Sequence, residues 1–323
     1  MRRRTVLAMP LALAACGREE KKSSQKIKIA FTPSYTVSQF YAGYEAGYFR
    51  DAGFDIDLDS SSSAQSIPLL AEGKIDAALL SASPALVNAA LRGSRIKVVA
   101  ARECAAASCS GSMRMYVSRK AFPNGILDMH PLRGKTIGNS SLFSQFCIDE
   151  ILRASQMTEK DVRFERLDAG AALVAVSAGK VDAVYSSNDM ATIPAEFDLA
   201  PGPRLAETLP DHQFGFILFG PSFLDAPVSV GAKFLKAYFR GTREFLGGKT
   251  PQYLLNLAKE NHWAPGTEDR ICRQGVVKDG VVRMQDLRTF AQWCFDNKHT
   301  DRLLDPAMLV DNRYLDAASG GQA

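Results

Sequence analysis

The segment AEGKIDA at residues 71–77 returns 106 residues later as SAGKVDA at residues 177–183. Other matches keep this spacing without a gap: SQF at 38–40 with SQF at 144–146, Ser34 with Ser140, and Ser81 with Ser187. Two copies are too few for a solenoid, which needs at least three repeats to bury a continuous core. The sequence therefore predicts two similar lobes.

The two copies also share one order of expected elements. Each opens with a short apolar strand and a polar turn, followed by a helix, a second strand, a second helix that ends at a glycine, and a third strand. In the first copy we expect strands at 28–31, 54–58 and from 75, with helices around 40–48 and 64–72; in the second, strands at 136–138, 162–165 and from 181, with a helix at 171–178. Short strands that alternate with helices predict an α/β fold, with mainly parallel sheets flanked by helices. From about residue 228 helical patterns dominate, and we expect that segment to pack on the first lobe.

Polar residues gather where the expected strands end. In open α/β sheets ligands bind beyond the carboxyl ends of the strands. We therefore predict a cleft between the lobes, lined by Ser34, Tyr35, Ser62, Ser63, Ser81, Ser83, Arg102, Asn139, Ser140, Ser141, Phe143, Ser187, Asn188 and Asp189. The alternative is that the serines, asparagines and aspartate only cap helix N-termini. Asp189 is the residue that we expect to select the ligand, unless Arg102 or Lys135 neutralises it within the protein.

The N-terminus has the pattern of an export signal. Arg2, Arg3 and Arg4 precede an apolar run at residues 5–15, which is too short to span a bilayer. The run ends in LAACG at 13–17, and this ending resembles the lipobox of bacterial lipoproteins, in which the cysteine is acylated. We predict a signal peptide at 1–16, lipid on Cys16 and a tether at 17–26. The alternative is an ordinary signal with a chance cysteine. The first residues also resemble a loose twin-arginine signal.

Composition and motifs favour a binding protein over an enzyme. The 323 residues are 46% hydrophobic and 23% charged, with a formal net charge of +4 and no long basic block, so nucleic acid is not an expected partner. The four histidines are scattered, and the chain lacks a nucleophile elbow, a phosphate-binding loop or a dinucleotide fingerprint in the required context. We expect no cofactor and no metal.

The cysteines predict one short disulfide. If Cys16 carries lipid, five cysteines remain. Cys104 and Cys109 are close enough in sequence to close a small loop in an oxidising compartment, and we predict that they form a disulfide. The alternative is two buried thiols. The sequence leaves open which of Cys147, Cys272 and Cys294 are paired.

Four segments together resemble a known family: FTPS at 31–34, YAGYEAGYF at 41–49, AEGKIDAA at 71–78 and LRGKTIG at 132–138. With them, residues from about 26 to 245 resemble the periplasmic binding proteins for alkanesulfonates, taurine, nitrate and thiamine-pyrimidine precursors. The resemblance implies a type II periplasmic-binding fold, with lobe one at 27–115 and 212–323 and lobe two at 116–211. It also implies a monomer whose lobes close on a small molecule at a hinge. The closed form would dock on an ABC permease with its ATPase. The expected location is the periplasm or the cell surface, with the protein anchored to a membrane by lipid.

The resemblance leaves other functions and several ligands open. Some enzymes of pyrimidine and menaquinone-precursor metabolism share this fold, but the cysteine-rich CCCFC motif of the pyrimidine synthases is absent. A ligand-sensing receptor module is a further alternative. Hydroxyl-rich strand ends would suit an oxyanion, whereas Glu103 and Asp189 would repel a bare anion. Tyr35, Tyr41 and Phe143 could stack on a ring, so a ring-bearing or donor-rich ligand is expected over sulfonate or nitrate.

Overall fold

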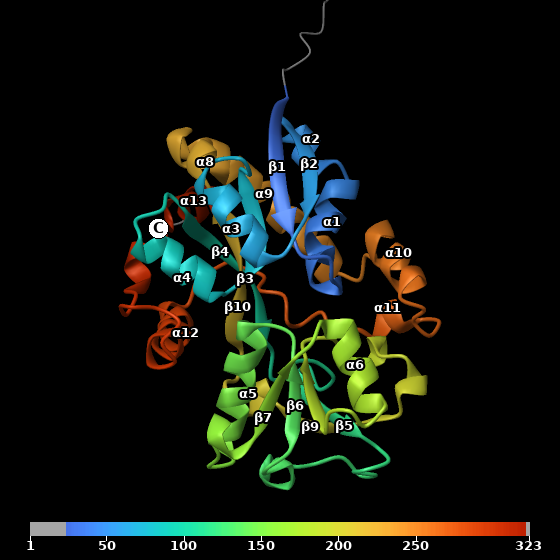
Figure 1. Cartoon of the computed structure of the whole chain (residues 1–323). Helices are drawn as coiled ribbons and strands as arrows, with labels where there is room; N and C mark the ends of the chain where they lie inside the picture. The colour runs from blue at the N-terminus through green and yellow to red at the C-terminus, as the bar shows by residue number, and fades with distance from the viewer. Residues whose placement is uncertain (1–23, 321–323) are drawn as a thin grey trace, which may run out of the picture.

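The computed structural model describes residues 24–320 and contains two five-stranded sheets, one above the other (Figure 1). The first sheet has the order β2-β1-β3-β10-β4, with β1 at Gln25–Phe31, β2 at Phe54–Ser60, β3 at Ala77–Ser81, β4 at Lys97–Ala105 and β10 at His212–Phe219. The second has the order β7-β6-β8-β5-β9, with β5 at Arg114–Ser118, β6 at Thr136–Asn139, β7 at Arg163–Arg166, β8 at Ala183–Ser186 and β9 at Leu199–Arg204. The predicted signal peptide, Cys16 and most of the predicted tether lie outside the described residues. Strand β1 begins at Gln25, three residues before the strand start expected at residue 28.

The repeated sequence forms the same three-stranded unit in both lobes. Strands β2-β1-β3 and β7-β6-β8 have the same order and are parallel. The aspartate of each repeat accepts a hydrogen bond from a backbone amide of the neighbouring strand: Lys28 N, within β1, donates to Asp76 Oδ2 at 2.7 Å, and Thr136 N, at the start of β6, donates to Asp182 Oδ2 at 2.8 Å. The glycine of each repeat has φ +71°, a backbone conformation that glycine adopts readily. The motif thus turns the chain from helix to strand and fixes the strand beside its neighbour.

Helices cover both sheets. The first lobe carries α1 at Ser38–Glu45, α2 at Tyr48–Asp51, α3 at Ser63–Ala71, α4 at Pro84–Leu91, α8 at Pro221–Asp225, α9 at Val228–Leu246 and α13 at Arg313–Ala318. The second carries α5 at Leu142–Ala154, α6 at Ala169–Ser177 and α7 at Leu205–Thr208. The helix expected around 40–48 is divided, because Gly47 takes φ +79° between α1 and α2. Long α9 buries Phe234 against Phe49, Phe219 and Phe223, and a buried phenylalanine contributes about 1.5–3 kcal/mol.

The C-terminal helices contact both lobes. Besides α9 and α13, they are α10 at Gln252–Glu260, α11 at Thr267–Arg270 and α12 at Met284–Asp296. Helix α11 lies beside the short helix η4 of the second lobe, Met190–Thr192, on the right of Figure 1. Helix α12 reaches the second lobe through Trp293, whose Nε1 donates to Asp149 Oδ2 of α5 at 2.7 Å. This segment therefore packs on more than the first lobe, where we expected it.

The backbone passes between the sheets at residues 106–113 and again at 205–211. None of the helices within residues 24–320 combines the length and the apolar character that a membrane crossing needs.

Candidate functional site

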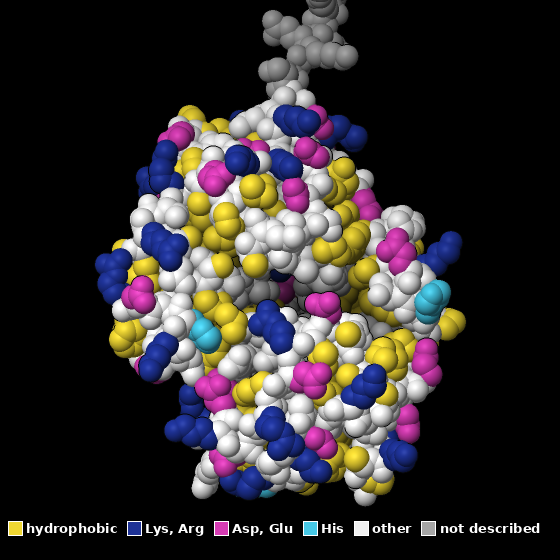
Figure 2. Space-filling model, viewed as in Figure 1, with side chains coloured by type: hydrophobic (Ala, Val, Ile, Leu, Met, Phe, Trp, Pro, Cys, Tyr) yellow, Lys and Arg dark blue, Asp and Glu magenta, His cyan; other side chains and the backbone are white. Residues whose placement is uncertain are grey.

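A cavity of about 650 Å³ lies between the two lobes. The surface is hollowed between the lobes on the face shown in Figure 2. The volume falls within the range of about 300–1,000 Å³ that is usual for small-molecule sites. Both lobes supply the walls, and the walls are built largely from the carboxyl ends of strands and the N-termini of the helices that follow.

Twelve of the fourteen residues predicted for the cleft line this cavity. They are Ser34, Tyr35, Ser62, Ser63, Ser81, Ser83 and Arg102 from the first lobe, and Ser140, Ser141, Phe143, Ser187 and Asn188 from the second. Asn139 and Asp189 do not line the cavity. Both side chains are buried, next in sequence to the lining residues Ser140 and Asn188. The repeat therefore brings matched polar segments to one cavity.

Two of the predicted serines also serve as helix caps. Ser83 Oγ accepts a hydrogen bond from Leu86 N at 3.3 Å at the start of α4. Ser141 Oγ accepts one from Ser144 N at 3.0 Å at the start of α5. Each hydroxyl keeps a proton that it can donate, so capping and ligand contact are compatible.

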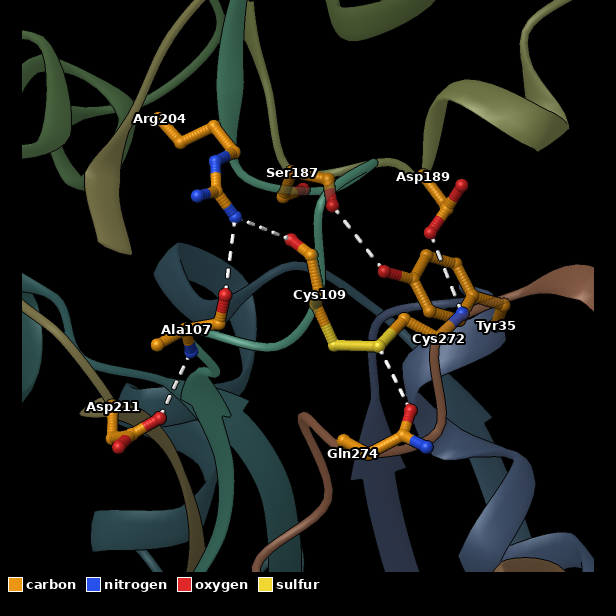
Figure 3. Close-up of a disulfide and its surroundings, with 9 residues drawn as sticks. All are labelled: Tyr35, Ala107, Cys109, Ser187, Asp189, Arg204, Asp211, Cys272 and Gln274. Carbon is orange, nitrogen blue, oxygen red and sulfur yellow. Dashed lines mark hydrogen bonds between the residues drawn. A yellow bond between two sulfur atoms is a disulfide. The ribbon is translucent and has the colours of Figure 1, made fainter. Parts of the chain in front are cut away.

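Tyr35 links the lobes across the cavity. Its hydroxyl donates to the backbone oxygen of Ser187 at 3.4 Å (Figure 3). Burial, and then the charge of Asp189, raises the pKa of Tyr35, so its hydroxyl stays protonated. Tyr35 therefore acts as a neutral donor that joins the first strand end of lobe one to the third strand end of lobe two.

Asp189 accepts hydrogen bonds from backbone amides and pairs with neither of the cations expected. Its Oδ1 accepts from Ala191 N at 2.9 Å, at the start of η4, and its Oδ2 lies 3.4 Å from Cys272 N (Figure 3). Lys135 instead pairs with Asp182. Asp189 does not line the cavity, so the role in ligand choice expected for it has no support from its position.

The disulfide joins Cys109 to Cys272, with 5.5 Å between their Cα atoms (Figure 3). The predicted Cys104–Cys109 pair is therefore wrong. Cys104 lies on β4 and is a free thiol, as are the buried Cys147 and Cys294. The physical reason is that the later segment pairs with β4, the edge strand of the first sheet, as a further strand would. Cys104 N donates to Gly275 O at 2.8 Å, and Val277 N donates to Arg102 O at 3.0 Å. This pairing places residues 272–277 along β4 and brings Cys272 to the first crossover.

The C-terminal part of the chain supplies walls that the sequence did not indicate. Phe245, Cys272, Gly275 and Val276 line the cavity, although they lie outside both repeats. Phe245 is held by Arg273, whose guanidinium lies 4.4 Å from the ring centroid and donates to Phe245 O at 2.7 Å. Nothing in the local sequence around them indicates a place at the cleft.

Among the groups that serve in acid–base chemistry, the cavity wall offers the carboxylates of Glu103 and Asp168. No histidine of the described residues lines it. His212 is buried elsewhere, 3.5 Å from Asp286. Burial raises the pKa of Cys104 to about 11, which disfavours the reactive thiolate. Over residues 24–320 there is no group of three or more His, Cys, Asp or Glu side chains that could hold a metal ion.

This two-lobed α/β architecture is the type II periplasmic-binding fold. A family model described as NMT1/THI5 like matches residues 35–202, which is just over half of the chain, and the chain belongs to that family. The search of curated protein sequences found no match to this chain.

Several solved structures share the fold over nearly the whole chain. The periplasmic aliphatic sulphonate binding protein SsuA from Escherichia coli is 14% identical, with a TM-score of 0.70 over 90% of this chain and 92% of its own. The alkanesulfonate-binding SsuA from Xanthomonas axonopodis pv. citri, bound to MOPS, is 16% identical, with a TM-score of 0.69 over 88% and 98%. The periplasmic nitrate-binding protein NrtA from Synechocystis PCC 6803 is 11% identical, with a TM-score of 0.67 over 93% and 89%. At these identities the likeness concerns the fold.

Proposed function

We propose that this protein is an extracytoplasmic solute-binding protein that captures a small organic molecule between its lobes and delivers it to an ABC importer. The observation that carries the proposal is the cavity itself, because two copies of one structural unit turn their polar strand ends toward it. The similarity of the protein's fold to binding proteins for sulfonates and nitrate supports the same role. A binding role also accounts for the missing histidine and thiolate better than catalysis does.

Closure of the lobes is the mechanism that we infer. The chain crosses between the sheets at 106–113 and 205–211, and such connections can absorb a rotation of one lobe against the other. A ligand held by both lobes would favour the closed form, because only that form makes all of its contacts. Tyr35 and Ser187 already meet across the cavity and would lie on opposite sides of it in an open form.

Native mass spectrometry of freshly purified protein tests capture directly, through a co-purified small molecule. Small-angle scattering with and without that molecule tests closure, and we expect a smaller radius of gyration in its presence. Bound ligand at 100-fold excess over its Kd should also stabilise the fold by about 2.7 kcal/mol. An unchanged scattering envelope with a tight ligand would contradict closure, and the absence of any retained or added ligand would contradict capture.

We also infer that the protein is exported and held at a membrane by lipid on Cys16. The basic, apolar and small-residue pattern of residues 2–17 supports export. Strand β1 starts at the end of the first lobe that faces away from the second lobe (Figure 1). An anchor a few residues before Gln25 would leave the cavity unobstructed.

A further inference from the structure

Glu103 is brought to the cavity by a bulge in β4. Gly215 of β10 pairs with Glu103, and the next residue, Phe216, pairs with Ala101, so Arg102 is an extra residue on β4. Successive side chains of a regular strand point to opposite faces, but Arg102 and Glu103 both line the cavity. Bulges of this kind commonly re-aim side chains beside functional sites.

Gly215 gives the Glu103 side chain its room. A Cβ at position 215 would lie 2.8 Å from Glu103 Cβ and 2.9 Å from its Oε2. Such distances are too short for real contacts, so any larger residue would displace the carboxylate. The carboxylate therefore lies directly over the Gly215 backbone, in a position that the partner strand keeps free.

The acceptor capacity of Glu103 is largely unused. The residue is 3% exposed, and its ion pair with Arg102 is the only polar side-chain contact that it makes with the described residues. Arg102 also donates to Thr36 O at 2.9 Å. Arg102 contacts Glu103 Oε1, and no described side chain donates to Oε2, although a carboxylate has about four acceptor sites. A donor on a bound ligand would therefore stabilise this buried carboxylate.

The same cavity receives three helix N-termini. Its walls include Ser63 and Ala64 of α3, Ala85 of α4, and Leu142 and Phe143 of α5. The first amides of a helix have no carbonyl partner within it, and the helix dipole favours negative charge there. The buried side chains of the cavity carry one positive and one negative charge, on Arg102 and Glu103. An anion alone would leave Glu103 with Arg102 as its only side-chain donor among the described residues, whereas a cation alone would offer the helix amides no acceptor.

We propose that the cleft selects a ring-bearing zwitterion, with its amine on Glu103 and its anionic head at the N-termini of α3, α4 and α5. The volume of about 650 Å³ and the rings of Tyr35, Phe143, Phe214 and Phe245 in the walls provide for the ring. Glu103 is then the residue that distinguishes this ligand from an amine-free sulfonate or carboxylate. The inference rests on the proposed function, since it concerns what the same cavity captures.

Two matched pairs of probes test it on the full-length protein by titration calorimetry. The first pair is 4-(aminomethyl)benzenesulfonate and toluene-4-sulfonate, and the second is 4-(aminomethyl)benzoate and 4-methylbenzoate. We expect wild-type protein to bind the amine of each pair at least 10-fold more tightly, because a site that needs a donor rejects the analogue without it. Glu103→Gln should remove this preference, and Glu103→Asp should retain part of it. The melting temperature of each variant shows whether it is folded.

Equal or tighter binding of the amine-free probes to wild-type protein would overturn the inference, as would an undiminished preference in folded Glu103→Gln. Failure of all four probes to bind at about 10 mM, a concentration at which even very weak binding registers, would overturn it too. The proposed function is decided separately. If one of these outcomes rejects the zwitterion, compaction by an amine-free probe or by the co-purified molecule would still support the solute-binding role. If Glu103→Gln fails to fold, the wild-type preference and Glu103→Asp still decide.

Discussion

Replacing Cys272 by serine removes the bond that ties residues 272–277 to the first crossover between the lobes. The disulfide closes a loop of 163 residues. In the chain-entropy treatment, a loop of this length lowers the entropy of the unfolded chain by about 17 cal/mol/K, or about 5 kcal/mol at 25 °C. We take this as an upper bound, because residual structure in the unfolded chain reduces the effect. A loss of about 2–5 kcal/mol is expected.

Urea denaturation measures the loss, with Cys104→Ser as the matched control. Cys272→Ser and Cys109→Ser should each lower the midpoint by the same amount, and reductant should lower the wild-type midpoint to theirs. Cys104→Ser should behave as wild type, because Cys104 is a free thiol. Thiol counting on denatured, unreduced protein should find Cys104, Cys147 and Cys294 reactive, and Cys109 and Cys272 protected. Equal midpoints with and without reductant, or a loss in Cys104→Ser that matches Cys272→Ser, would refute the reasoning.

Three further outcomes are expected. Burial raises the pKa of Asp149 to about 7, so the folded state binds more protons than the unfolded state between about pH 4 and 7, and stability falls as the pH rises through that window. Asp149→Asn, which keeps an acceptor for Trp293 Nε1, should flatten this fall in melting temperatures measured at pH 5 and pH 8; an unchanged slope would reject the assignment. Asp76→Ala and Asp182→Ala should each cost about 1–3 kcal/mol, because each leaves a backbone amide of the neighbouring strand without its acceptor, and hydrogen exchange should speed up only in the lobe that carries the change. Cys16→Ser should leave an unacylated precursor, and a variant that still partitions into detergent like wild type would rule out the lipid anchor.

The repeat is sufficient to predict both lobes and most of the cavity wall. Its matched spacing places Ser34 and Ser140, and Ser81 and Ser187, at strand ends, and all four line the cavity. Strand ends can be predicted because they depend on local alternation and on glycine and aspartate at fixed positions.

Contacts between distant segments cannot be predicted in this way. The partner of Cys109 is set by the pairing of residues 272–277 with β4, and no local pattern near residue 272 reveals it. The partners of Asp189 are backbone amides of Ala191 and Cys272, which a search for opposite charges does not consider. Glu103 reaches the cavity through a bulge, and a strict alternation of side chains would have pointed it or Arg102 away.

The position of β10 has a consequence for the order in which the two sheets can form. All five strands of the second sheet come from one continuous stretch, residues 114–204, so that lobe can complete its sheet as soon as this stretch is available. The first sheet cannot, because β10 at residues 212–219 lies between β3 and β4. Four early strands must therefore wait for a central strand that is synthesised after the whole second lobe. The Cys109–Cys272 bond comes later still, and it closes only after the first lobe has acquired its last strand.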